Sequence, residues 1–213
     1  SRRYTGKLDS DADEFIGFAV DGAKRMQGLI NDLLIYSRAG RSDGIYEEID
    51  TAEVVGEALR NLGDRLKSSN GEVTLGELPN IVADRQQLVS IFQNLLSNSI
   101  KYRSASRDPR ITITAERTTK AWKFAIKDNG IGINSAFTDR IFTIFQRLHG
   151  RDEYQGTGIG LAVVKKVVER ANGQIWVESE PDERSTFIFT VIDRVLEGDS
   201  NQNNEGSDLS VAS

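Results

Sequence analysis

The chain has 213 residues, a formal net charge of −5, no cysteine and a single histidine, His149. That length is sufficient for one good-sized hydrophobic core and a smaller appendage. The composition excludes disulfides, thiolate metal sites and a histidine-rich metal centre, and its acidic balance argues against a general nucleic-acid-binding surface. No apolar run is as long as a membrane span, and no signal peptide opens the chain. The abrupt start without methionine leads us to expect a piece of a longer protein.

Residues 10–39 are predicted to form one long helix, followed by a polar linker at 38–46. Apolar side chains recur at steps of three and four residues, as in a heptad seam, at Ile16, Ala19, Ala23, Met26, Ile30 and Leu33. A helix of this length extends roughly 40 Å, which is too long to pack wholly on a small domain. We therefore expect partner helices and place a domain boundary in the linker; the alternative is a core helix of a single globule.

The chain beyond the linker predicts an α+β domain. Short strands are predicted at 47–49, 73–75, 81–83, 110–116, 122–127, 174–178 and 186–192. Helices are predicted from about 51 to 66, 84 to 102 and 159 to 171, with a short helix around 139–145. This order lacks the strand–helix alternation of a doubly wound parallel sheet and favours a sandwich of helices on a mixed sheet. The polar residues 197–213 predict a disordered C-terminal tail.

The helix at 84–102 has an unusual polar face. Asp84 is the expected N-cap, with Gln87 three residues later as in a capping box. The face opposite the apolar side chains is uncharged until Lys101 and carries Asn94 and Asn98 one turn apart. Asparagine is a poor helix former, so this stripe indicates a ligand with oxygen atoms and negative charge. The alternative is a surface stripe that happens to consist of amides.

Two glycine-rich motifs follow this helix, DNGIGI at 128–133 and GTGIGL at 156–161. The second opens a predicted helix, where free N–H groups suit phosphate. It lacks the lysine of a P-loop, and the preceding 151–155 segment is not the strand that a dinucleotide fingerprint requires. The first motif taken alone is equally a plain turn. Each motif alone is weak evidence for a phosphate site. The two motifs together with the asparagine stripe, in this order and at this spacing, are strong evidence for one.

In this combination the chain resembles the sensor histidine kinases of two-component systems, most closely the phytochrome-like subgroup. QNLLSNSIKY at 93–102 resembles their N box, DNGIGI the G1 box, FTIFQRLH at 142–149 the F box and GTGIGLAVVKK the G2 box. The resemblance implies the GHKL-type ATP-binding fold, a two-layer α/β sandwich whose mixed sheet carries three helices on one face. It implies three regions: a truncated dimerisation and phosphotransfer segment at 1–40, a catalytic domain at 45–194 and the tail at 197–213.

The resemblance implies ATP and Mg²⁺ as ligands. Asn98 would be the Mg²⁺ ligand and Asn94 would support the metal or a phosphate. Lys101 would contact phosphate, with Tyr102 beside it. These side chains form the expected catalytic end of the site, since a neutral carbonyl oxygen suits a hard cation that also takes phosphate oxygens.

The resemblance places the adenine at Asp128, which would accept a hydrogen bond from its amino group, with Thr186 completing that end through water. Gly130 and Gly132 would admit the base, although Asp128 is alternatively a turn carboxylate. The other implied nucleotide contacts are Ile133, Arg147, Leu148, Gly156, Thr157, Gly158, Ile159, Gly160 and Leu161. Arg147 is equally explained as a solvated side chain. Residues 133–157 would be a mobile lid, anchored by Phe142 and Phe145.

Two departures from related ATPases refine the expected function. Position 94 is an amide where hydrolysing relatives carry a glutamate, and an amide is no general base. The resemblance places the family's phosphate-accepting histidine in the helix before residue 10, and it is missing here. His149 lies in the lid motif and is not the expected acceptor. The expected function is transfer of the ATP γ-phosphoryl group to a histidine outside this chain and onward to a response-regulator aspartate. A gyrase- or chaperone-type ATPase and a degenerate binding module are the rivals.

The resemblance also implies partners and location. We expect a homodimer through the long helix, a response-regulator receiver domain as protein partner, and neither nucleic acid nor membrane in direct contact with this chain. A cytoplasmic location follows, with any membrane anchor in a preceding part of the parent protein.

Overall fold

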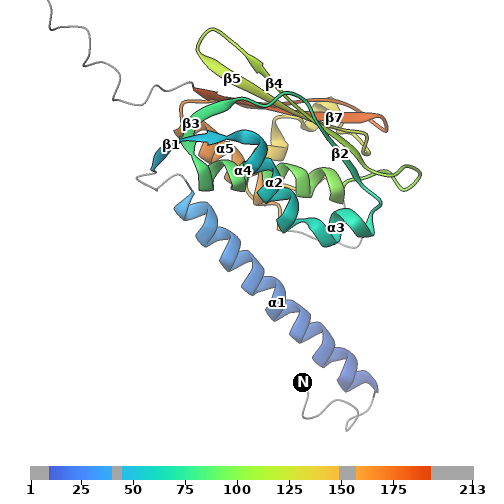
Figure 1. The fold of residues 1–213 in the computed structure, drawn as a ribbon. Coiled ribbons are helices and arrows are strands. Elements are labelled where there is room, and N and C mark those ends of the chain that lie inside the picture. The colour runs from blue at the N-terminus through green and yellow to red at the C-terminus, as the bar shows by residue number, and fades with distance from the viewer. Residues whose placement is uncertain (1–9, 40–44, 149–156, 193–213) are drawn as a thin grey trace, which may run out of the picture.

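A long helix leads into a two-layer domain (Figure 1). The computed structural model describes residues 10–39, 45–148 and 157–192. The long helix is α1 (Ser10–Arg38). The domain contains, in chain order, β1 (Tyr46–Asp50), α2 (Thr51–Asn61), α3 (Gly63–Ser68), β2 (Glu72–Leu75), β3 (Asn80–Asp84), α4 (Arg85–Lys101), β4 (Arg110–Arg117), β5 (Ala121–Asp128), the 3-10 turns η1 (Ser135–Phe137) and η2 (Arg140–Phe142), α5 (Gly160–Arg170), β6 (Ile175–Glu180) and β7 (Arg184–Ile192).

The main sheet is mixed, as predicted. Its five strands lie in the order β2-β4-β5-β7-β6, with β2 and β4 parallel and the other neighbours antiparallel. A separate antiparallel pair joins β1 to β3. Helices α2, α4 and α5 lie side by side on one face of the sheet (Figure 1). The predicted α+β sandwich is therefore confirmed.

An aromatic cluster in the core joins α4 to the central strands. Phe92 of α4 meets Phe124 of β5 and Phe189 of β7 edge-on, with ring centroids 5.8 and 5.5 Å apart. All three side chains are fully buried, and Phe124 stacks on Phe189 in the neighbouring strand. The alternation of each strand directs every second side chain to this core, so the same face continues through Ile126 to Asp128 at the end of β5.

Two predicted helices differ from the structure. The segment at 51–66 is not one helix, because α2 ends before Leu62, whose ψ of 5° leaves the helical range, and α3 begins at Gly63. Glycine is a poor helix former and allows the break, while the apolar spacing that predicted one helix continues through buried Leu62. The expected short helix at 139–145 is instead the single 3-10 turn η2, and η1 lies just before that segment.

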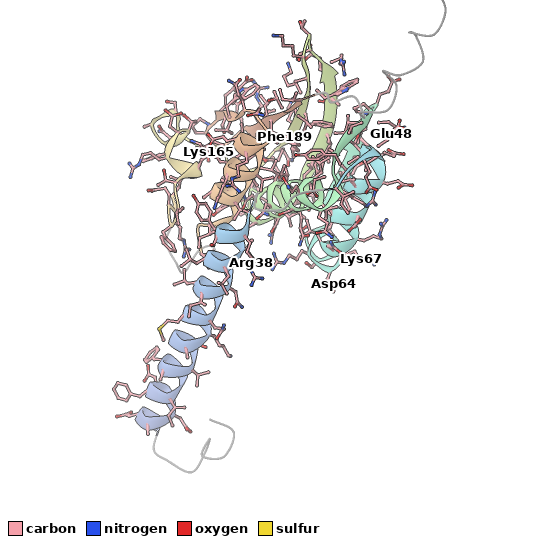
Figure 2. All side chains as sticks on the ribbon, turned by 90° about the vertical axis from the view of Figure 1, so that its left-hand side faces the viewer. Arg38, Glu48, Asp64, Lys67, Lys165 and Phe189 are labelled. Atoms are coloured by element: carbon pink, nitrogen blue, oxygen red, sulfur yellow. The ribbon has the colours of Figure 1, made fainter. Side chains whose placement is uncertain are left out.

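The C-terminal end of α1 contacts the domain, and the remainder stands clear of it (Figure 2). The Lys166 ammonium of α5 donates to the Tyr36 carbonyl oxygen at 2.6 Å and lies over the Tyr36 ring. Farther along α1, large apolar side chains are exposed: Phe15, Phe18, Met26, Ile30 and Leu33. The predicted seam thus lacks a partner among the described residues. No described helix combines the length and apolarity required to cross a membrane.

Candidate functional site

Helix α4 carries the polar stripe predicted from the sequence. Asp84 accepts from the Gln87 backbone N–H at 3.1 Å and from the Gln87 side-chain amide at 2.8 Å, so the predicted cap is confirmed. The apolar face of the helix is buried against the sheet. This packing fixes the rotation of α4 about its axis. It turns Asn98 toward a pocket at the C-terminal end of the helix.

The pocket lies between α4, the loop after β5, β7 and the start of α5, and its volume of about 570 Å³ includes space open to solvent. Eight residues predicted as site residues line it: Asn98, Tyr102, Asp128, Gly132, Ile133, Arg147, Leu148 and Leu161. Five further lining residues were not predicted: Ile131, Ile141, Gln146, Ser185 and Phe187. The lining is largely apolar with a few polar groups, a composition typical of small-molecule sites.

Asp128 is the buried carboxylate of the pocket, with a side chain 6% exposed. Its Oδ2 accepts from the Ser99 hydroxyl at 3.0 Å, and its Oδ1 accepts from the Gly130 backbone N–H at 3.0 Å. Burial raises the pKa of the Asp128 carboxyl above its usual range, while the hydrogen bonds from Gly130, Ser99 and the Ser185 backbone oppose the rise. Three protein donors therefore hold the carboxylate in place at the base of the pocket.

We expect nucleotide affinity to fall in mild acid because of this raised pKa. The ionised Asp128 carboxylate can accept a hydrogen bond from the ligand, whereas protonation removes one of its acceptor sites. Because its pKa is raised, this loss of affinity should begin at a higher pH than it would for an ordinary aspartate. Titrations of ATP across the acidic range would measure it. Asp128→Asn is the control, since its affinity should lack this component. Parallel pH profiles for the two proteins would contradict the expectation.

Of the two adjacent hydroxyl residues on β7, Ser185 lines the pocket and Thr186, expected at the adenine end, does not. In the β5–β7 register Ser185 lies opposite Asp128 and Thr186 opposite Lys127. Successive strand residues point to opposite faces, so Ser185 shares the core face with Asp128 and lines the pocket, while Thr186 points to the other face. The role expected of Thr186 stays a prediction, and Ser185 is the hydroxyl residue of this pair that faces the pocket.

The glycines of the 128–133 motif allow the loop to pack closely on the protein. A Cβ at Gly130 would lie 2.5 Å from the Tyr102 carbonyl oxygen, and one at Gly132, where φ is +68°, would lie 2.1 Å from that of Glu180. The loop is tied on both sides, because the Ile131 N–H donates to Tyr102 and the Ile131 carbonyl accepts from Asp182. These glycines thus shape one wall of the pocket.

At the expected phosphate end, Asn94 of α4 contacts the start of α5. Gly160 packs directly on Asn94, since a Cβ there would lie 2.7 Å from Asn94 Oδ1. The Asn94 amide donates to the Ser90 carbonyl oxygen at 2.8 Å, and the Lys101 ammonium donates to the Tyr102 hydroxyl at 2.9 Å. Asn94 and Lys101 therefore flank Asn98 on α4, although neither lines the pocket.

Two side chains of the second glycine motif, those of Thr157 and Ile159, point away from the pocket. The Thr157 hydroxyl donates to the Asp32 carboxylate on α1, so it faces the long helix. Ile159 is 1% exposed and packs in the core, so its side chain is structural. Gly158 has a φ of +77° and lies against the Gln146 carbonyl oxygen. Gly156 lies outside the described residues.

The expected anchoring of the lid segment is half correct. Phe142 is 8% exposed and packs on the domain, as predicted. Phe145 is 55% exposed, so its expected anchoring role is wrong. Its backbone has a φ of +63°, and its N–H donates a hydrogen bond to the Gly158 carbonyl oxygen. The lid itself falls partly outside the described residues, as does His149.

The donor set for a metal ion is sparse in the described part of the chain. No group of three or more His, Cys, Asp or Glu side chains is clustered there to hold a metal. Asn98 alone offers a carbonyl oxygen to the pocket from the asparagine stripe. A single amide ligand fits Mg²⁺, which keeps several waters and takes phosphate oxygens instead of requiring an all-protein cage.

Comparison with known proteins defines the class of this chain. Residues 83–194 match the family described as histidine kinase-, DNA gyrase B- and HSP90-like ATPase, and the chain belongs to this family. Within it, the chain contains the ATP-binding catalytic domain of a sensor histidine kinase, as the sequence predicted.

The similar proteins include cyanobacterial phytochromes. The chain is 49% identical over 189 residues to the phytochrome-like protein Cph1 of Synechocystis sp., a match covering 89% of this chain and 25% of that protein. It is 48% identical to cyanobacterial phytochrome A of Nostoc sp., with the same coverage. The chain thus spans about a quarter of the length of these relatives.

Solved structures share the fold. Full-length ShkA in complex with AMPPNP matches with a TM-score of 0.69 at 22% identity, over 90% of this chain and 41% of that one. The histidine kinase AdeS of Acinetobacter baumannii matches with a TM-score of 0.66 at 24% identity, over 90% and 89% of the two chains. At these identities the likeness concerns the fold.

Proposed function

We propose that this chain binds Mg-ATP and transfers its γ-phosphoryl group to a histidine imidazole of the same kinase, from which the group passes to a response-regulator aspartate. The observation that carries the proposal is one pocket lined by the buried carboxylate of Asp128 and by Asn98, with Asn94 beside it packed on Gly160 at the start of α5. The imidazole nitrogen would attack the γ-phosphorus as the bond to the bridging oxygen breaks and ADP leaves.

The side chains would act chiefly by positioning and electrostatics, as phosphoryl transfer requires. Asn98 would hold Mg²⁺ through its carbonyl oxygen. Lys101 would place a positive charge near the phosphates and Arg147, which lines the pocket, would add a second. The Mg²⁺ ion would neutralise charge on the phosphate oxygens.

Asn94 supports transfer to protein over hydrolysis. It lies one helical turn before Asn98 and against the start of α5, where a water-activating group would have to lie. Its amide already donates to Ser90 and cannot take a proton from water. Water is thus a poor acceptor in this site, which favours an imidazole.

Further proposals concern organisation and partners. The exposed apolar seam of α1 supports a homodimer through this helix, with residues 1–40 as a separate dimerisation segment and 45–194 as the catalytic domain. A response-regulator receiver domain is the proposed protein partner; one similar solved structure, at 19% identity, is the histidine kinase ThkA in complex with the response regulator TrrA. A cytoplasmic location is proposed with them.

The chain alone is expected to bind ATP and to form almost no acid-labile phosphoryl adduct. Its one histidine, His149, lies in the lid motif and is not on a dimerisation helix. Incubation with γ-labelled ATP, with and without a longer polypeptide of the same kinase that carries the upstream helix, measures this. Label on the added polypeptide supports the proposal. Label accumulating on His149, or rapid release of free phosphate by the chain alone, would refute it.

A further inference from the structure

A network of three hydroxyl and carbonyl groups lies behind the adenine end of the pocket. The hydroxyl of Ser179 on β6 donates to the Arg184 carbonyl oxygen at 2.8 Å and accepts from the Ile133 backbone N–H at 2.8 Å. Its oxygen lies 2.9 Å from the hydroxyl oxygen of Ser185 on β7. Ser179 lies outside the pocket lining, whereas Ser185 and Ile133 belong to it.

These contacts decide the direction of the bond between the two serines. A serine hydroxyl has one proton to donate and two lone pairs to accept with. The Ser179 proton is committed to the Arg184 carbonyl, which can only accept. Ser185 must therefore donate its own proton to Ser179, which fills the second lone pair of Ser179.

The consequence is a pocket end that accepts hydrogen bonds and donates none from its side chains. The hydroxyl proton of Ser185 is engaged in the hydrogen bond to Ser179, so Ser185 offers the pocket only lone pairs. Asp128 beside it is a carboxylate that accepts hydrogen bonds from Ser99, Gly130 and the Ser185 backbone, and it has lone-pair capacity left for a further donor. A ligand group placed here must donate, and a ligand oxygen would leave buried acceptors facing one another.

We propose that Ser179 is a positioning residue for nucleotide selectivity: by taking the Ser185 proton it makes this end of the pocket select a purine with an exocyclic amino group over a 6-oxo purine. This inference rests on the proposed nucleotide site. It adds a residue that touches no ligand and acts through Ser185.

Mg-ATP and Mg-ITP are the probes, because ITP carries an oxygen where ATP carries the amino group. Calorimetric titration of the full chain should show ATP bound at least about tenfold more tightly than ITP. In Ser179→Ala the freed Ser185 hydroxyl can turn and donate to the ITP oxygen. The ATP-to-ITP affinity ratio should then fall by a factor of about three or more.

A double-mutant cycle tests whether Ser179 acts through Ser185. Ser185→Ala should lower the ratio similarly, and adding Ser179→Ala to it should lower the ratio no further. Ser179→Thr retains the hydroxyl and should keep the ratio, and the exposed Ser106→Ala is the matched control. If Ser179→Ala does not fold, Ser179→Cys, whose thiol is a weak acceptor, should show the same fall.

Several outcomes would overturn the inference. An equal loss of affinity for both nucleotides in Ser179→Ala would show a merely structural role, and independent effects of the two serines would remove the proposed link. ATP binding without preference over ITP in the unaltered chain would refute the inference and leave the proposed function standing. Binding of neither nucleotide would refute both.

Discussion

Replacing Asp128 by asparagine is expected to weaken ATP binding roughly fivefold to 150-fold, since an amide mismatch at a buried hydrogen bond costs on the order of 1–3 kcal/mol. Asp128 is 6% exposed, and its carboxylate already accepts hydrogen bonds from Ser99, Gly130 and the Ser185 backbone. An asparagine amide would turn an –NH₂ group toward one of these donors or toward the ligand amino group. The loss of affinity should come from weaker recognition of the adenine base.

Calorimetric titration with Mg-ATP and Mg-GTP measures this effect. Because the substitution alters only the base-reading end, the Mg²⁺ dependence of binding should stay as in the unaltered chain. Asp108→Asn, an exposed change in the loop before β4, is the matched control and should bind normally. If GTP competed as well as ATP against the unaltered chain, Asp128 would not read the amino group.

Replacing Asn98 by alanine is expected to remove most of the Mg²⁺-dependent part of ATP affinity. Asn98 is the one residue of the stripe Asn94, Asn98, Lys101 that lines the pocket, and its carbonyl oxygen is the proposed ligand for Mg²⁺. The ratio of ATP affinity with Mg²⁺ to that in a chelator should therefore approach about one, since only the magnesium-independent contacts remain.

The control for this change is Asn61→Ala, at the exposed end of α2 and away from the pocket, which should leave the ratio unchanged. Thermal unfolding of both variants would show whether each is folded. An Asn98→Ala protein that is folded and keeps the full Mg²⁺ dependence would refute the metal assignment, and the ion would then be held by other groups.

Much of the domain followed from local patterns in the sequence. Strands such as β4 and β5 alternate apolar and polar residues, and their inward side chains are those the alternation predicts. The same holds for α4, where the Asp84–Gln87 cap and the apolar spacing set its start and its buried face. Local periodicity is sufficient here because each signal involves residues a few positions apart.

The site required more than local pattern. Thr186 and Ser185 are adjacent and chemically alike, and only the pairing of β7 with β5 directs Ser185 to the face of Asp128. A shift of one residue reverses the face, so a sequence motif without the register could not show which of the two hydroxyl groups faces the pocket.

The sequence by itself determined the order of elements, the capped helix with its asparagine stripe and the family to which the glycine motifs belong. Only the tertiary structure showed that Thr157 bonds Asp32 across 125 positions and that Ile133 bonds Ser179 across 46. Only the structure also showed that the helix is interrupted at Leu62 and that Phe145 is exposed. Such contacts join loops and strand ends distant in the chain, and no periodic signal encodes which of them meet.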